Sequence, residues 1–126
     1  MVKQNTQETG LLTTHVLDTA RGCPAAGISI SLYRVNQDYD FDLIGTGETN
    51  CDGRLEAAIL SGSDFCEGTY QLIFHVSKYL KSNFVEPFAG QFLADIPIRF
   101  SINNDREHYH IPLLLSPFGY STYRGS

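Results

Sequence analysis

Two histidines near the carboxyl end of the chain, His108 and His110, have the spacing of side chains that share one face of a strand. Successive strand side chains point to opposite faces, and two residues span about 7 Å. Tyr109, Ile111 and Leu113 then fall on the other face, where they can enter a core. Because imidazole titrates near neutral pH and binds metal ions, the pair predicts either acid–base chemistry or a metal site.

Two further side chains could join this pair. His15 lies in an extended, β-branched segment, 11–17, on the face that also carries Leu11 and Leu17. Arg54 directly follows Asn50-Cys51-Asp52-Gly53, which has Asn first and Gly last, as in a type I turn. Taken singly, each has an ordinary alternative, since surface strands tolerate histidine and a solvated arginine is common.

A zinc site would need a third ligand beside His108 and His110, and His15 is the available candidate. The order of residues along the chain does not fix that geometry. The sequence therefore leaves three alternatives for these histidines: structural residues, acid–base catalysts or metal ligands.

The end of the chain is unusual in composition. Chain termini normally lose order and drift towards small polar residues. Here the last four residues are Tyr123, Arg124, Gly125 and Ser126. Because glycine tolerates a close backbone approach that other residues would block, this ending predicts an ordered contact.

The bulk composition excludes several classes of protein. The chain has 126 residues, which fits one domain, and its net charge of −5 disfavours a nucleic-acid binder. Its nine Lys and Arg residues are scattered, and no apolar run is long enough to span a bilayer. The three cysteines, Cys23, Cys51 and Cys66, form no C-x-x-C pair and no export signal is visible, so we expect reduced thiols and a cytoplasmic protein.

The pattern of apolar residues predicts an all-β domain with one short helix. Period-2 alternation is typical of half-buried strands, and short strands at regular turns indicate an antiparallel β-sandwich. We expect residues 1–10 to be a flexible lead and residues 11–126 to form one domain. The predicted helix spans residues 77–84, and the predicted strands are 11–17, 27–32, 41–49, a short strand starting at Arg54, 69–76, 96–102, 108–115 and 119–124.

The usual nucleophile motifs are absent from the sequence, including Gly-x-Ser-x-Gly and His-Glu-x-x-His. If the protein is an enzyme, it works with imidazoles and arginine and without a cofactor. Such a set suits water attack on an activated carbonyl in a small anionic ring. One histidine would take a proton from water while arginine holds the anion or the developing oxyanion.

Four segments carry a resemblance to a known family. They are Thr14-His15-Val16-Leu17-Asp18-Thr19-Ala20-Arg21-Gly22, Asp52-Gly53-Arg54, the run His108–Pro117, and Tyr123-Arg124-Gly125-Ser126. Together they resemble 5-hydroxyisourate hydrolase, the transthyretin-related family of purine breakdown, and the likeness covers residues 11–126. The terminal tetrapeptide separates these hydrolases from transthyretin, the hormone carrier.

The resemblance implies a transthyretin-like sandwich of two four-stranded sheets with a short helix after the fifth strand. It also implies a homotetramer, a dimer of dimers, with active sites between the dimers and with no cofactor or metal. The implied reaction is that of a cyclic amide hydrolase, which opens 5-hydroxyisourate to 2-oxo-4-hydroxy-4-carboxy-5-ureidoimidazoline (OHCU) in urate degradation. The implied catalytic residues are His15, Arg54 and His110, without His108, and the implied substrate-binding residues are Tyr123, Arg124, Gly125 and Ser126.

Two other functions compete with hydrolysis. A transthyretin-like carrier of a small ligand would use the same channel, but a carrier channel needs apolar walls, and this one would present His15, Arg54 and His110. A secreted adhesion-type sandwich is disfavoured by the cysteines and by the missing signal.

Chelation distinguishes the metal-site alternative from the cofactor-free one. We expect dialysis against EDTA to leave the rate of 5-hydroxyisourate ring opening unchanged, because imidazole and guanidinium would suffice for the chemistry. The measurement is the absorbance decay of freshly generated substrate before and after dialysis. Activity that disappears with EDTA and returns with zinc would contradict this expectation.

Overall fold

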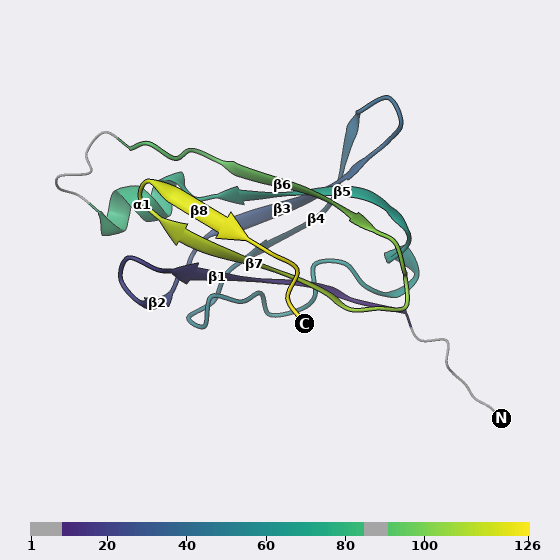
Figure 1. Cartoon of the computed structure of the whole chain (residues 1–126), viewed down its shortest axis with the longest axis horizontal. Helices are drawn as coiled ribbons and strands as arrows, with labels where there is room; N and C mark the ends of the chain where they lie inside the picture. Colours follow the sequence, from purple (N-terminus) through teal and green to yellow (C-terminus); the bar gives the residue numbers. More distant parts are fainter. Residues whose placement is uncertain (1–8, 85–90) are drawn as a thin grey trace.

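Eight strands build two sheets that face each other across the core (Figure 1). The computed structural model describes residues 9–84 and 91–126. The first sheet has the order β2-β1-β7-β8, formed by Cys23–Pro24, Leu12–Asp18, Tyr109–Ser116 and Gly119–Thr122. The second has the order β4-β3-β5-β6, formed by Phe41–Glu48, Ser29–Val35, Gly68–His75 and Ile96–Ile102.

The alternation of apolar residues decides which face of each strand enters the core. On β1, Leu12, Thr14 and Val16 are buried, whereas His15 is half-buried on the other face. The alternating apolar side chains expected on one face of β3, β5 and β7 are likewise buried. Each such side chain contributes about 1.5–3 kcal/mol through burial. The prediction of a β-sandwich with two four-stranded sheets is confirmed.

One strand pair in this largely antiparallel fold is parallel. Strand β1 pairs with β7 in a parallel ladder that sets Thr13 opposite His110 and His15 opposite Pro112. The strands come from opposite ends of the sequence, and Figure 1 shows them side by side in the middle of one sheet. This pairing brings the two predicted histidine segments together.

Two predicted strands differ from the structure. The strand expected from Arg54 is wrong, because residues 54–60 make only isolated bridges to β1, His15 with Arg54 and Leu12 with Leu60. The first sheet instead takes its fourth strand from β2, which lies between the predicted strands 11–17 and 27–32, where the turn after Asp18 folds the chain back against β1. Its proline is tolerated because β2 is an edge strand.

The ends of some elements also shift. The last strand ends at Thr122 and not at Arg124, and beyond it only Gly125 continues the antiparallel register, as an isolated bridge to His110. The helix, α1, spans Ser77–Asn83, one residue less than expected. A 3₁₀ helix, η2, occupies Gly62–Asp64. No helix within the described ranges is long and apolar enough to cross a membrane.

The flexible lead predicted for residues 1–10 falls mostly on residues 1–8, which lie outside the described residues. Gly10 is buried, and its backbone N–H donates to the Asp105 carbonyl at 2.8 Å. A Cβ atom added at Gly10 would lie 1.8 Å from the Glu107 carbonyl oxygen. Gly10 is therefore packed against the loop that precedes β7.

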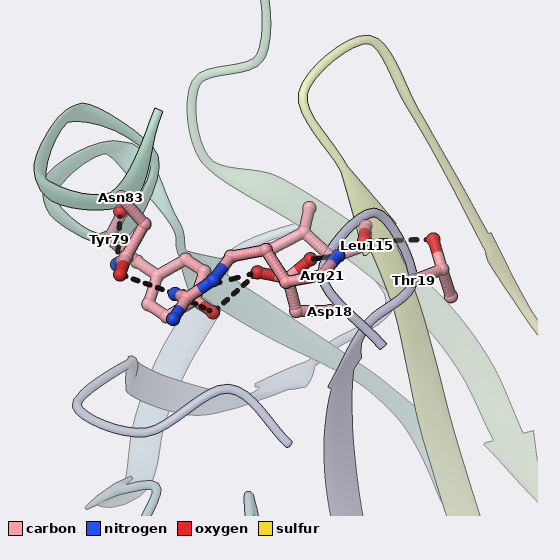
Figure 2. Close-up of polar contacts among 6 residues, drawn as sticks. All are labelled: Asp18, Thr19, Arg21, Tyr79, Asn83 and Leu115. Carbon is pink, nitrogen blue, oxygen red and sulfur yellow. Dashed lines mark hydrogen bonds and ion pairs between the residues drawn. The ribbon is translucent and has the colours of Figure 1, made fainter. Parts of the chain in front are cut away.

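A buried carboxylate ties the end of β1 to helix α1 (Figure 2). Asp18 is 1% exposed and accepts hydrogen bonds from the Tyr79 hydroxyl at 2.6 Å and from the Arg21 backbone N–H at 2.9 Å. The Arg21 guanidinium lies 4.0 Å from the same carboxylate and also donates to Asn83. Burial and the bond to Asp18 raise the pKa of Tyr79, so its hydroxyl stays protonated and keeps donating.

Replacing Tyr79 by Phe should destabilise the protein by about 1–3 kcal/mol, because a buried carboxylate loses its shortest hydrogen bond. Urea unfolding at fixed protein concentration measures the change. Tyr39→Phe is the matched control, since Tyr39 is 73% exposed and should change stability by less than about 0.5 kcal/mol. Equal stability of Tyr79→Phe and wild type would show that the Asp18 contact is not structural.

Candidate active site

The side chains of His15 and His110 lie next to each other on the outer face of the β1–β7 pair. Their ring centroids are 6.4 Å apart and the ring planes are inclined by 38°. The parallel register produces this contact, since His110 is opposite Thr13 and His15 is two residues further along the same face. The histidine that neighbours His110 across the sheet is thus His15.

His108 does not belong to this pair. It precedes the first residue of β7 and its side chain is exposed. Within residues 9–84 and 91–126, no group of three His, Cys, Asp or Glu side chains is placed to hold a metal ion. The spacing of His108 and His110, which the sequence left open, therefore builds no three-ligand site here.

The tight turn at residues 50–53 places Arg54 beside His15. The turn predicted at Asn50–Gly53 is present, with the Gly53 N–H donating to the Asn50 carbonyl at 2.8 Å. The turn lies directly on β1, because the Val16 N–H donates to the Gly53 carbonyl at 2.8 Å. Gly53 has φ +76°, and a Cβ there would meet the Val16 carbonyl oxygen at 2.5 Å. Only glycine fits both conditions, and this close contact sets Arg54 opposite His15.

The end of the chain closes on the other histidine. The Gly125 N–H donates to the His110 carbonyl at 2.6 Å. A Cβ at Gly125 would lie 2.8 Å from Cδ2 of the His110 ring, so a larger residue would displace the imidazole. Ser126 follows at once and is exposed. The ordered contact expected from the terminal composition is confirmed.

The other two residues of the tetrapeptide, Tyr123 and Arg124, contact a part of the molecule away from the two imidazoles. The Arg124 guanidinium stacks 4.0 Å above the Tyr109 ring and donates to Glu107 at 3.0 Å and to the His108 carbonyl at 3.1 Å. Since Tyr109 faces the core, Arg124 lies on the opposite side of β7 from the His110 ring. Together with the exposed Tyr123 it lines a cavity of about 250 Å³ against β6. In this chain Arg124 therefore anchors the tail.

Two hydrogen-bond partners of the imidazoles were not anticipated from the sequence. The Thr13 hydroxyl lies 2.8 Å from His110 Nδ1, and the Asp52 backbone carbonyl lies 3.1 Å from His15 Nε2. Each fixes the direction of one ring. No sequence signal marks them, because one depends on the register of a parallel ladder and the other is a backbone group.

The electrostatics of the cluster lower the pKa of both imidazoles and so favour their uncharged form. Burial lowers the pKa of His15 below its ordinary value, and the neighbouring Arg54 guanidinium lowers it further, although Asp52 works in the opposite direction. Burial, Arg54 and His15 together lower the pKa of His110. Neutral imidazoles can accept a proton, and Arg54 supplies a fixed positive charge beside them. A cavity of about 240 Å³ adjoins Arg54 and is also lined by Thr13 and Thr14.

These features define a class: a transthyretin-like sandwich whose outer sheet face carries two neutral imidazoles beside an arginine, with the chain end folded over them. The sequence model of the HIUase/Transthyretin family matches residues 12–125. The chain therefore belongs to the HIUase/Transthyretin family.

Individual relatives agree with this assignment. A protein of Rhizobium meliloti (strain 1021) named 5-hydroxyisourate hydrolase 2 is 51% identical over 119 residues, which cover 94% of this chain and 98% of the relative. The structure of Klebsiella pneumoniae 5-hydroxyisourate hydrolase is similar with a TM-score of 0.74 and 33% identity, covering 93% of this chain and 99% of that one. Sea bream transthyretin in complex with thyroxine is similar with a TM-score of 0.80 and 26% identity, covering 90% and 93%.

Replacing Arg54 by Gln should raise the pKa of both His15 and His110, because the fixed charge that opposes their protonation is removed. The rise should be partial, since burial is the larger cause of both lowered values. NMR titration of the ring protons measures it. Unchanged pKa values of His15 and His110 would show that the Arg54 charge does not act on these rings.

Proposed function

We propose that the protein hydrolyses 5-hydroxyisourate to OHCU. The observation that carries the proposal is the contact of His15 with His110 beside Arg54, assembled from three distant segments. The names of the Rhizobium and Klebsiella relatives support the substrate. A neutral base and a fixed cation are what water attack on the carbonyl of an oxygen-rich anion requires.

The reaction needs one proton transfer in each direction. A neutral imidazole takes a proton from water while the water oxygen bonds to the ring carbonyl carbon, and the carbonyl electron pair moves to its oxygen. The Arg54 guanidinium stabilises the negative charge that develops there and holds the oxygen-rich edge of the substrate. The carbon–nitrogen bond then breaks, and the nitrogen takes the proton that the water lost, which leaves a carboxylic acid and an opened ring.

The terminal tetrapeptide completes the site in this proposal. Gly125 lies against the His110 ring, so Ser126 can border bound substrate with its hydroxyl. Arg124 contributes indirectly, since its bonds to Glu107 and to the His108 carbonyl hold the tail in place. Tyr123 lines the separate cavity against β6 and, like Arg124, contributes by holding the tail.

We further propose a cytoplasmic homotetramer built as a dimer of dimers, which acts in urate degradation. Strand edges β6 and β8 are open in the single chain, and pairing across a two-fold axis would cover them. The exposed aromatic rings Phe118, Tyr120 and Tyr123 lie on or beside β8 and would be covered at the same time. The three cysteines are free, in agreement with the reduced thiols expected from the sequence.

The carrier alternative rests on the similarity to transthyretin, whose sea bream structure contains thyroxine. The polar character of the site argues against it here. A large hydrophobic ligand would have to desolvate Arg54 and two imidazoles without pairing them. An oxygen-rich anion would instead satisfy these groups.

Replacing His15, His110 or Arg54 by Ala should lower kcat/KM for 5-hydroxyisourate by about 10²–10⁴-fold, the range for losing a general base or an oxyanion stabiliser. Absorbance decay of freshly generated substrate, corrected for spontaneous decay, measures the rate. His108→Ala is the matched control and should keep wild-type activity, because that exposed imidazole lies outside the pair. Three alanine variants as fast as wild type would refute the site.

A further inference from the structure

The two imidazoles of the site are held through different ring atoms by different partners. His15 uses Nε2 to contact the Asp52 backbone carbonyl at 3.1 Å, whereas His110 uses Nδ1 to contact the Thr13 hydroxyl at 2.8 Å. A neutral imidazole carries its single proton on one of the two nitrogens, and the partner of each ring decides which. The contacts can therefore assign a role to each histidine.

The partner of His15 permits only one arrangement. A carbonyl oxygen accepts hydrogen bonds and cannot donate, so Nε2 of His15 must carry the proton. Burial and Arg54 lower the pKa of His15, which leaves the ring neutral and its Nδ1 with a free electron pair. The Asp52 carbonyl is held in place by the next residue, because the Gly53 carbonyl accepts a hydrogen bond from the Val16 N–H of β1. The backbone packs so closely there that a side chain at Gly53 would not fit.

The partner of His110 is a hydroxyl, which can donate or accept. Within the part of the chain that the structure describes, the Thr13 hydroxyl has no other hydrogen-bond acceptor than Nδ1 of His110. Donating its hydrogen to that nitrogen is the most favourable arrangement for this half-buried hydroxyl, because a donor without an acceptor would cost free energy. The proton of the neutral His110 ring then resides on Nε2, which makes Nε2 a hydrogen-bond donor.

We infer that His15 is the general base, acting through Nδ1, and that His110 donates a hydrogen bond from Nε2 to the oxygen on which charge develops. The Asp52 carbonyl and the Thr13 hydroxyl are positioning groups that fix these roles. The inference rests on the proposed function. In the reaction, His15 Nδ1 takes the water proton and later returns it to the leaving ring nitrogen, while the proton on His110 stays in place.

The first test is the protonation state of each ring nitrogen in the wild-type protein without substrate. The ¹⁵N chemical shifts of the imidazole nitrogens distinguish protonated from unprotonated atoms, and His15→Ala and His110→Ala spectra assign the signals. At pH 7.5 we expect Nδ1 unprotonated and Nε2 protonated in both rings. A His15 ring protonated on Nδ1 would overturn the assignment of the base, and a His110 ring protonated on Nδ1 would overturn the role of Thr13.

The second test removes the Thr13 hydroxyl while keeping the shape of the side chain. Thr13→Val should lower kcat about threefold to tenfold, as for one lost hydrogen bond, with KM within about twofold of wild type. The ¹⁵N signals of His110 should shift towards a mixture of both protonation states, and those of His15 should not. Thr13→Ser should restore kcat and the His110 signals.

The matched control is Thr19→Val, which removes the hydroxyl of the residue that follows β1, a group that donates to the Leu115 carbonyl of β7 (Figure 2). It should match wild type in kcat and in the histidine spectra. A Thr13→Val protein with unchanged kcat and unchanged His110 signals would refute the positioning role.

The outcomes separate this inference from the proposed function. An active enzyme whose His15 carries its proton on Nδ1 overturns the inference and leaves the function intact. A wild-type protein with the expected protonation states but without hydrolysis overturns both. Expected spectra together with an active wild type and a slowed Thr13→Val variant support both.

Discussion

The parallel ladder between β1 and β7 is the constraint on which the site depends. One strand lies near the start of the chain and the other near its end, so a single register places His15 and His110 on one face. The same register sends Leu12, Val16 and Leu113 into the core. A slip by one residue would expose the apolar set and bury the imidazoles. The burial that stabilises the sandwich therefore also fixes the geometry of the histidine pair.

Two close backbone contacts bring the remaining groups to that ladder. Gly53 lets the turn before Arg54 touch the backbone of β1, and Gly125 lets the tail touch the ring of His110. At both positions an added Cβ would overlap an atom of the site or of its strand. Arg124 and Glu107 then hold the tail from the far side of β7. The cluster is thus held by the β1–β7 ladder, by the turn at Gly53 and by the tail at Gly125.

The local electrostatics differ from those of the whole protein. The chain carries a net charge of −5, but Arg54 makes the surroundings of the imidazoles positive enough to oppose their protonation. Burial acts in the same direction, so the histidines stay neutral while the arginine keeps its charge. Neutral rings can exchange protons and the guanidinium can hold an anion. Neutral imidazoles beside a charged guanidinium suit hydrolysis of an oxygen-rich ring better than binding of an apolar ligand.

The sequence by itself determined the strand faces, the short helix, the turn before Arg54 and the order at the chain end. These are local features, set by alternation over a few residues or by a glycine with a special conformation. The resemblance added the family and the trio of His15, Arg54 and His110. The spacing alone could not choose between His108 and His110 as the functional histidine, because strand order and register, which set His15 beside His110, are non-local.

Only the tertiary structure decided which groups meet. It replaced the strand expected at Arg54 by isolated bridges, since that segment follows β1 for only a few contacts, and it made an edge strand of Cys23–Pro24. It also supplied Thr13 and the Asp52 carbonyl as partners of the imidazoles. A hydroxyl two residues before His15 and a backbone oxygen carry no pattern in the chain, and they acquire a role only when β7 and the turn pack against β1.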